Sequence, residues 1–337
     1  MKTLKILVIR FSSIGDIVLT SPVIRCLKKQ LPNSEIHILT KAAYARISDA
    51  NPYVDKIHSF RHGLYEVIPQ LKKEHYDCII DLHKNLRSFR VRMLLWCKTY
   101  AFSKLNFRKW WFVKTKRNVM PDLHIVDRYM NCVKPLGVVN DGEGLDFFIA
   151  DDDKVYSPAF PLSFQKGYVA LVVGSKHATK QMPTDFLIRL CTQIKHPIVL
   201  IGGEADSEKA KQIENAVGTK VFNTCGAYTI GQSASVIESA LGVVTPDTGM
   251  MHIAAAYRKN IVSVWGNTVP SFGMYPYFPK NHTGESVIME NKNLSCRPCS
   301  KLGYRHCPKK HFKCMNELSP GAIAAIVNRW SMGNEEK

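Results

Sequence analysis

Short apolar runs recur along this chain, and stretches with apolar residues at helical spacing separate them. Residues 4–10 (LKILVIR) are almost continuously apolar, which is typical of a strand in a parallel sheet that is covered on both faces. A helix is expected from about 17 to 31, where Pro32 ends it. The other elements expected in this half are strands at 35–40, 56–60 and 76–82 and helices at 42–50 and 63–74. This alternation predicts βαβ units and a doubly wound α/β domain.

A second series of strands follows a looser connecting segment, 118–165, which contains glycines, prolines and a short acidic run. Helices of about 10–15 residues fit between these strands. We therefore predict two domains, 1–160 and 161–337. The strands expected in the second domain are 168–173, 198–201, 221–223, 241–245 and 261–265.

The stretch 240–256 (ALGVVTPDTGMMHIAAA) combines a strand, a tight turn and the start of a helix. Asp247 is a candidate N-cap, because its carboxylate can accept from the first unpaired N–H groups of the helix. Thr248 and Gly249 would leave those N–H groups approachable, so the turn could hold an anion at the positive end of the helix. His252 follows one turn into the helix. The local sequence is equally compatible with an ordinary capped helix.

The charge is unevenly distributed along the 337 residues. The formal net charge is +18, and no acidic residue occurs between Asp81 and Asp122, where basic residues alternate with aromatic ones. Such a surface suits the headgroup level of an anionic bilayer or single-stranded nucleic acid, and the alternative is a soluble basic face with its tryptophans in the core. No apolar run has the length of a membrane span or of a secretory signal, so we expect a cytoplasmic protein.

Four cysteines lie close together near the C-terminus, with two histidines between them. Cys296 and Cys299 form a C-x-x-C pair, and Cys307 and Cys314 follow at a looser spacing. This spacing is compatible with a structural zinc site, with reduced thiols or with a disulfide. We assign no metal site from the sequence.

Three segments carry a resemblance to a known family. Residues 11–16 (FSSIGD), 174–183 (GSKHATKQMP) and 247–252 (DTGMMH) resemble motifs of glycosyltransferase family 9, the lipopolysaccharide heptosyltransferases, and the resemblance covers nearly the whole chain. Met182 stands where the family usually has Trp. The resemblance implies an α/β protein of the GT-B fold, in which two Rossmann-like domains face a central cleft. The last helical pattern, 320–330, would cross back to the first domain in that fold.

Sugar transfer needs a base for the acceptor hydroxyl and positive potential at the departing nucleotide diphosphate. Asp16 follows the first strand, where ligands of open α/β sheets bind. From local sequence alone it is an N-cap, whereas the family motif makes it the catalytic base. Ser12 and Ser13 would hold the loop or the acceptor. We also assign Lys84 and Arg87, in the acid-free interval, to acceptor binding.

The donor would bind to the second domain. Lys180 is the candidate for neutralising the diphosphate, together with the helix start at Thr248 and Gly249. The residues assigned to the donor besides Lys180 are Ser175, Thr179, Glu204, Asp247, Thr248, Gly249 and His252. Glu204 follows a glycine turn and would accept from ribose hydroxyls, as an acid does in dinucleotide sites.

The resemblance implies an inverting, metal-independent transferase without a cofactor. Its donor would be ADP-L-glycero-D-manno-heptose and its acceptor the anionic lipopolysaccharide core. We expect peripheral association with the inner face of the cytoplasmic membrane and no nucleic acid partner. Two alternatives stay open at this point: another GT-B nucleotide-sugar enzyme such as a 2-epimerase, and a non-enzymatic protein that binds nucleic acid or a membrane.

Overall fold

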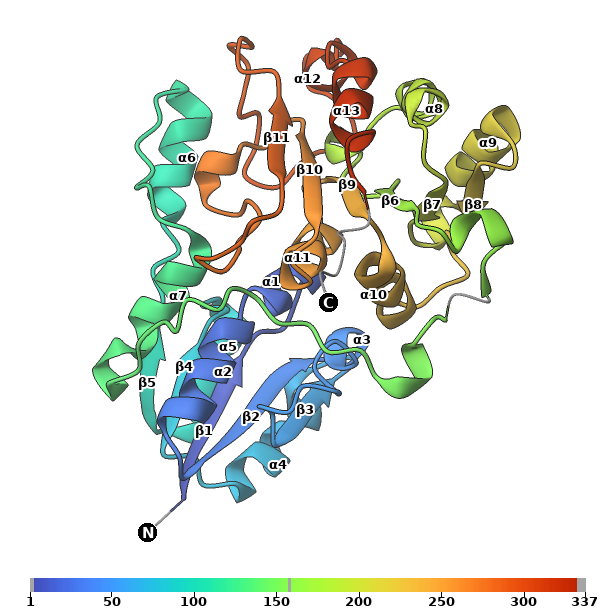
Figure 1. Ribbon diagram of the computed structural model, residues 1–337. Coiled ribbons are helices and arrows are strands. Elements are labelled where there is room, and N and C mark those ends of the chain that lie inside the picture. The colour runs from blue at the N-terminus through green and yellow to red at the C-terminus, as the bar shows by residue number, and fades with distance from the viewer. Residues whose placement is uncertain (1–2, 157–158, 332–337) are drawn as a thin grey trace. The chain divides into compact units, whose positions relative to one another are not determined.

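The computed structural model describes residues 3–156 and 159–331. Its chain divides into two compact units (Figure 1). Unit 1 comprises 1–105, 123–150 and 277–280, and unit 2 comprises 106–122, 151–276 and 281–337. Each unit contains one parallel β-sheet with helices, so the α/β prediction is confirmed.

Unit 1 contains a five-stranded sheet in the order β3-β2-β1-β4-β5. Its central strand β1 pairs in parallel with β2 and β4, so that Leu7 lies beside His37 on one side and Ile79 on the other. Leu7, Leu71 and Val91 belong to one buried cluster, so α4 and α5 cover the sheet face that carries Leu7. The strands are β1 (Leu4–Ile9), β2 (Ser34–Lys41), β3 (Lys56–Phe60), β4 (Cys78–Asp81) and β5 (Lys98–Ala101), and the helices are α1 (Ile14–Val18), α2 (Ser21–Gln30), α3 (Ala42–Ala45), α4 (Ile68–Lys73), α5 (Leu86–Leu95) and α7 (Ile125–Val133).

Three predicted helices of unit 1 are shorter than the sequence pattern suggested. The helix expected over 42–50 is only the four residues of α3. The helix expected over 17–31 is broken into α1 and α2, and Pro22 lies in the first turn of α2. Proline has no N–H and a fixed φ, so it is tolerated there because the first turn needs no intrahelical donor. Pro69 stands in the first turn of α4 in the same way, so the helix expected over 63–74 begins at Ile68, after a short 3₁₀ turn.

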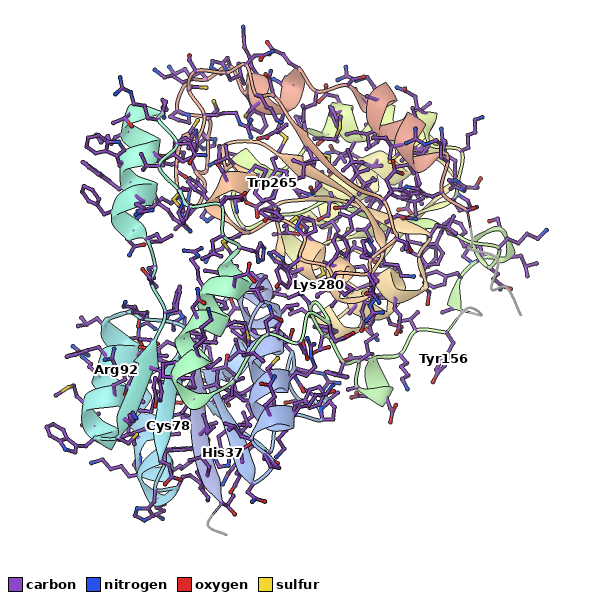
Figure 2. The ribbon with its side chains drawn as sticks, turned by 60° about the vertical axis from the view of Figure 1, so that its left-hand side comes forward. His37, Cys78, Arg92, Tyr156, Trp265 and Lys280 are labelled. Carbon is purple, nitrogen blue, oxygen red and sulfur yellow. The ribbon has the colours of Figure 1, made fainter. Side chains whose placement is uncertain are left out.

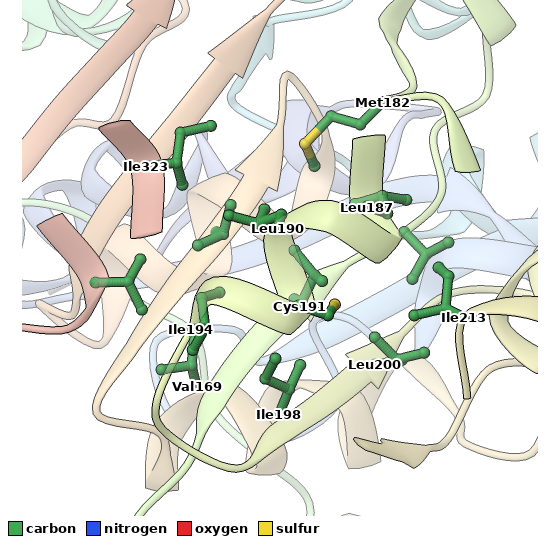
Figure 3. Packing of buried hydrophobic residues seen from close by; sticks show 14 of the residues in the cluster. Val169, Met182, Leu187, Leu190, Cys191, Ile194, Ile198, Leu200, Ile213 and Ile323 are labelled. Carbon is green, nitrogen blue, oxygen red and sulfur yellow. The ribbon is translucent and has the colours of Figure 1, made fainter. Parts of the chain in front are cut away.

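Unit 2 contains a six-stranded parallel sheet in the order β11-β10-β9-β6-β7-β8. Figure 3 shows its core, where Met182, Leu190 and Ile323 converge from different segments. The strands are β6 (Val169–Val172), β7 (Ile198–Ile201), β8 (Val221–Asn223), β9 (Gly242–Pro246), β10 (Asn260–Trp265) and β11 (Ser286–Glu290), and the helices are α6 (Asn106–Thr115), α8 (Thr184–Gln193), α9 (Ser207–Val217), α10 (Ile230–Ser239), α11 (Gly249–Ala256), α12 (Lys313–Asn316) and α13 (Pro320–Val327).

The domain limits predicted from the sequence, 1–160 and 161–337, place two segments in the other unit from the one in which they pack. Helix α6 belongs to unit 2, where Phe112 contacts Phe272 edge-on with ring centroids 5.8 Å apart. Residues 277–280 belong to unit 1. The last helix, α13, packs against α8 within the core of unit 2, where Trp330 is also buried. Within residues 3–156 and 159–331, no helix has the length and apolarity that a membrane crossing requires.

Candidate active site

The loop after β1 holds the side chain of Asp16 in a fixed position. Ser13 is the N-cap of α1, and its N–H and Oγ both donate to Asp16 Oδ2 at 3.1 and 2.8 Å. Arg10 Nη2 lies 2.5 Å from Asp16 Oδ1. Asp16 is therefore at the third position of the helix in a capping box, and the N-cap interpretation of this residue is wrong. Its side chain is 23% exposed, which leaves the carboxylate accessible.

Arg10 is the residue that organises this loop, and the sequence analysis missed it. Its guanidinium is buried and donates to the carbonyl oxygens of Ser12 and Leu82 and to the hydroxyl of Tyr129. Burial alone would raise the pKa of Asp16, but the charge of Arg10 and the hydrogen bonds from Ser13 lower it below its usual value. Asp16 is thus an ionised, acceptor-only carboxylate.

The loop after β4 lies beside the Asp16 loop, because β1 and β4 are neighbours and Ile9 pairs with Asp81. The rings of Phe11 and His83 are 4.7 Å apart. The pKa of His83 is lowered to about 3, mainly by burial and in addition by the charge of Arg10, so its imidazole is neutral. The structure thus brings the loop that carries Lys84 to the same sheet edge as Asp16.

Asp81 shapes the loop that carries the two predicted acceptor-binding cations. Asp81 is fully buried, and its Oδ1 accepts from the backbone N–H groups of His83 and Lys84 at 3.0 and 2.7 Å. Lys84 and Arg87 are both exposed, and Arg87 lies in the first turn of α5. Both side chains are therefore accessible to an anionic ligand.

In unit 2, the loops after β6 and β9 meet through a pair of opposite charges. Lys180 Nζ lies 2.6 Å from Asp247 Oδ2, and Thr268 Oγ1 donates to the same oxygen at 2.8 Å. These loops meet because β6 and β9 are adjacent, with Leu171 paired to Val244. Asp247 is not the helix cap, because Thr248 occupies the N-cap position and α11 begins at Gly249. The prediction of Asp247 as N-cap is therefore wrong by one residue.

The other predicted donor residues differ in their accessibility. Thr179 is buried, and its hydroxyl exchanges hydrogen bonds with the backbone of Tyr304, so it is occupied within the protein. Ser175 is half-buried and Glu204 is exposed. His252 is 2% exposed and lies inside the unit. A pocket of about 370 Å³ next to Thr179 is lined by Ala178, Thr179, Arg305, His306, Cys307, Lys310 and Phe312.

Comparison with known proteins identifies the family. The sequence model of glycosyltransferase family 9 (heptosyltransferase) matches residues 64–305. The chain belongs to glycosyltransferase family 9. It is 22% identical over 302 residues to lipopolysaccharide heptosyltransferase 2 of Escherichia coli K12, covering 80% of this chain and 84% of that protein. It is 24% identical over 293 residues to lipopolysaccharide heptosyltransferase 1 of Campylobacter coli, covering 80% and 85%.

Solved structures agree with this assignment at the level of the fold. A family 9 glycosyltransferase from Veillonella parvula superposes with a TM-score of 0.73 at 19% identity, covering 97% of this chain and 98% of that one. The E. coli ADP-heptose LPS heptosyltransferase II superposes with a TM-score of 0.72 at 19% identity, covering 96% and 98%. The family 9 enzyme therefore has the GT-B fold, and it is a glycosyltransferase, as the sequence motifs predicted.

The cysteine segment of this family 9 enzyme supports the loops after β9 and β10 through Arg297, a second residue that the sequence analysis missed. The buried guanidinium donates to the carbonyl oxygens of Gly266, Asn291, Trp265 and Thr268 and to Glu290 Oε2, at 2.6, 2.6, 3.3, 2.9 and 2.9 Å. Thr268 in turn holds Asp247. The sequence carried no signal for this role, because the burial of Arg297 and its partners appear only in the folded structure.

The thiols of this segment do not form a disulfide in the structure. All ten cysteines, each within the described residues, are free. Cys299 Sγ donates to the carbonyl oxygen of Cys296 at 3.2 Å, and burial raises the pKa of Cys299 to about 11. No three of the ligand atoms in segment 296–314, which the structure describes throughout, lie within 4.8 Å of one another. The structure thus shows reduced thiols here.

Proposed function

We propose that this family 9 enzyme transfers a heptose from ADP-L-glycero-D-manno-heptose to the lipopolysaccharide core, with inversion at the anomeric carbon. The named relatives are lipopolysaccharide heptosyltransferases, which supports this acceptor class. Two structural neighbours are E. coli heptosyltransferase WaaC with ADP and with ADP-2-deoxy-2-fluoro heptose, which supports the donor. Transfer would take place on the inner face of the cytoplasmic membrane.

The observation that carries the proposal is the fixed, ionised carboxylate of Asp16 at the carboxyl end of β1. Asp16 accepts the proton of the acceptor hydroxyl while the hydroxyl oxygen attacks the anomeric carbon and the bond to the diphosphate breaks. A single displacement of this kind inverts the configuration. Because Arg10 lowers the pKa of Asp16, the proton moves late, when attack has made the hydroxyl strongly acidic.

The departing diphosphate gains negative charge, and unit 2 offers two groups that stabilise it. One is Lys180, which is 16% exposed and paired with Asp247, so the diphosphate would compete with Asp247 for this cation. The other is the amino end of α11, where the N–H groups after Thr248 lack intrahelical partners. Together they supply the positive potential that a Mg²⁺ ion supplies in other sugar transferases, so we propose transfer without a metal at the leaving group.

Helix α5 and its flanks carry the features expected of a membrane-docking element. Apolar side chains on this helix face solvent between arginines, and none of its residues is acidic. The exposed apolar residues are Leu86, Phe89, Met93, Leu94 and Trp96. The tryptophans of the acid-free interval are exposed too, at 83% for Trp96, so they are not core residues. Each basic side chain near an anionic surface contributes about 1 kcal/mol, so a few suffice for reversible docking.

Vesicle sedimentation tests this docking. We expect the protein to bind phosphatidylglycerol vesicles at low salt and to dissociate as salt rises, since the attraction is electrostatic. Trp96→Ser should weaken the binding, while Tyr65→Ser, which removes another exposed aromatic residue outside the acid-free interval, should not. Equal binding to neutral and anionic vesicles, or equal effects of the two substitutions, would contradict docking through α5.

A thermal-shift screen against ADP-, UDP- and GDP-sugars tests the donor. Only a ligand that binds the folded state raises the melting temperature, so ADP-heptose should give the largest shift. The transfer rate should not rise when Mg²⁺ or Mn²⁺ is added. Turnover of the sugar nucleotide without any acceptor would instead favour an epimerase, and salt-sensitive retention on single-stranded DNA without sugar-nucleotide binding would favour a nucleic acid binder.

A further inference from the structure

A second cluster of polar side chains lies in unit 1, toward the amino ends of the strands and away from the Asp16 loop. His37 is on β2 and His58 on β3, while Glu74 follows α4 and Tyr76 precedes β4. His37 pairs with Lys56 and Leu39 with His58, so alternation places both imidazoles on the same face of the sheet. Figure 2 labels His37 on β2, and Cys78 on β4, the strand that Tyr76 precedes.

The cluster is inside the protein but next to its surface. His37, His58 and Tyr76 are 0, 2 and 7% exposed, and the side chain of Glu74 is 13% exposed. Two imidazoles and a carboxylate are seldom buried together, because buried polar groups cost free energy unless they have partners. Glu74, at the rim, gives the cluster a path to solvent.

The ligand atoms of these residues have the separations of a metal site. His37 Nδ1 lies 3.4 Å from His58 Nε2, which lies 3.8 Å from Glu74 Oε1, and all three atoms lie within 4.8 Å of one another. Tyr76 Oη is 2.8 Å from His37 Nδ1 and 3.1 Å from His58 Nε2. Four ligands placed tetrahedrally about 2.0–2.1 Å from a zinc ion are separated by about 3.3 Å. The observed distances bracket that value.

The hydrogen bond of His37 to Glu35 also suits metal binding. Glu35 Oε1 lies 2.7 Å from His37 Nε2, so this nitrogen donates its proton to the carboxylate and Nδ1 presents its lone pair to the cluster. Lys56 and Lys5 both contact the carboxylate of Glu74, at 2.6 and 3.0 Å.

We propose that His37, His58 and Glu74 bind a divalent first-row metal ion, Zn²⁺ by preference, with the hydroxyl of Tyr76 at the fourth corner. Two imidazoles and a carboxylate are ligands that suit zinc. The ion would tie β2, β3 and the end of α4 together. This role is structural and independent of the proposed sugar transfer. Lys56 Nζ lies 2.6 Å from Glu74 Oε1, but its side chain is 53% exposed and can move into solvent when the ion binds.

Titration of the metal-stripped, full-length protein with Co²⁺ tests this site, because Co²⁺ replaces Zn²⁺ and its visible absorption reports coordination. We expect one Co²⁺ per chain with four-coordinate absorption and without the charge-transfer band of a cobalt–thiolate bond. His58→Gln should weaken binding at least about 100-fold, since even the loss of an outer partner such as Glu35 costs about 10–100-fold. Cys296→Ser/Cys299→Ser should bind like the wild type.

Two further variants keep the test decisive if His58→Gln does not fold. Glu74→Gln, at the rim, should also weaken binding, whereas Lys56→Ala should strengthen it by removing the competing cation. Lys72→Ala, at an exposed lysine of α4, is the control and should change nothing. A thiolate charge-transfer band lost in the cysteine variant would move the metal to segment 296–314. No Co²⁺ binding, or binding indifferent to Glu74→Gln and Lys56→Ala, would mean that the four residues form a metal-free hydrogen-bond network.

Discussion

Replacing Arg10 by Met should reveal the titration of Asp16 in the pH dependence of transfer. Arg10 supplies the charge that holds the pKa of Asp16 below its usual value, against the effect of burial. An adjacent arginine lowers the pKa of a carboxyl by about 1–3 units, so its removal should raise the pKa of Asp16 by that amount. A base acts only when deprotonated, so the fall of kcat/KM toward acid should begin at a higher pH in the variant than in the wild type. In the wild type, kcat/KM should fall only at a pH below the usual pKa of an aspartate.

The same substitution should destabilise unit 1. It leaves the carbonyl oxygens of Ser12 and Leu82 without this donor and leaves Asp16 without its cation. Breaking a buried ion pair costs about 3–5 kcal/mol, and because Asp16 is partly exposed we expect about 3 kcal/mol in urea unfolding. Tyr129→Phe is the control: it removes one hydrogen bond of Arg10, for about 1 kcal/mol, and should leave the pH profile unchanged.

The assay is acceptor-dependent release of ADP, measured as kcat/KM from pH 4.5 to 8. His83, Lys104 and Asp81 also surround Arg10, and the pKa of His83 is lowered partly by that charge. If Asp16 is the titrating group, the double variant Arg10→Met/His83→Asn should therefore still lose kcat/KM as the pH falls. Asp16 would be refuted as the base if kcat/KM of the folded Arg10→Met variant did not change with pH. It would also be refuted if the acidic fall in kcat/KM disappeared when His83 was replaced.

Three other substitutions test the Arg25–Asp141 ion pair of unit 1, the packing of Trp330 in unit 2 and the support of the loop after β10. Asp141→Asn should lower stability by about 2 kcal/mol at pH 7. A hydrogen bond from buried Arg25 lowers the pKa of Asp141 to about 2, so this contribution is present above the unfolded pKa near 3.8 and disappears in urea unfolding as the pH falls toward 2. Gly242→Ala should cost about 1–3 kcal/mol in the same assay, because a Cβ would lie 2.5 Å from the ring of Trp330, and a loss below about 0.5 kcal/mol would contradict that packing. Arg297→Lys should weaken ADP binding about tenfold in calorimetry, because lysine cannot make all the hydrogen bonds by which Arg297 holds the loop after β10. Unchanged affinity would mean that Arg297 contributes to stability alone.

The strand pattern of the sequence was sufficient for the central part of each sheet. The run at 4–10 is β1 and the run at 241–245 is β9, because strands buried on both faces must be continuously apolar. The edge strands β5 and β11 were not predicted, since both are short and half-exposed and carry polar residues that resemble a loop. The break between α1 and α2 was missed because the apolar spacing continues across it.

The candidate site was predicted as far as local motifs reach. The position of Asp16 after β1 and that of Lys180 after β6 follow from the strand–loop order. Their partners do not: Arg10 reaches Asp16 through the strand end, and Asp247 turns from the helix end to Lys180 because β6 and β9 are adjacent. Such contacts depend on strand order, which the sequence pattern leaves undetermined.

The polar cluster around His37 had no sequence signal at all. Its members come from three separate elements, and none of them is spaced like a metal motif. Parallel register brings His37 and His58 to one sheet face, and the end of α4 adds Glu74. Only the register and the packing of α4 reveal the cluster.

Release of ADP by an Asp16→Asn variant, with ADP-heptose as donor and with or without a lipopolysaccharide core acceptor, tests the proposed transfer most directly. The wild type should release ADP only when the acceptor is present. The variant should release almost none, while ADP-heptose raises its melting temperature as much as it does for the wild type. Release without acceptor in the wild type, or a near-normal rate in Asp16→Asn, would contradict the proposed reaction and its base.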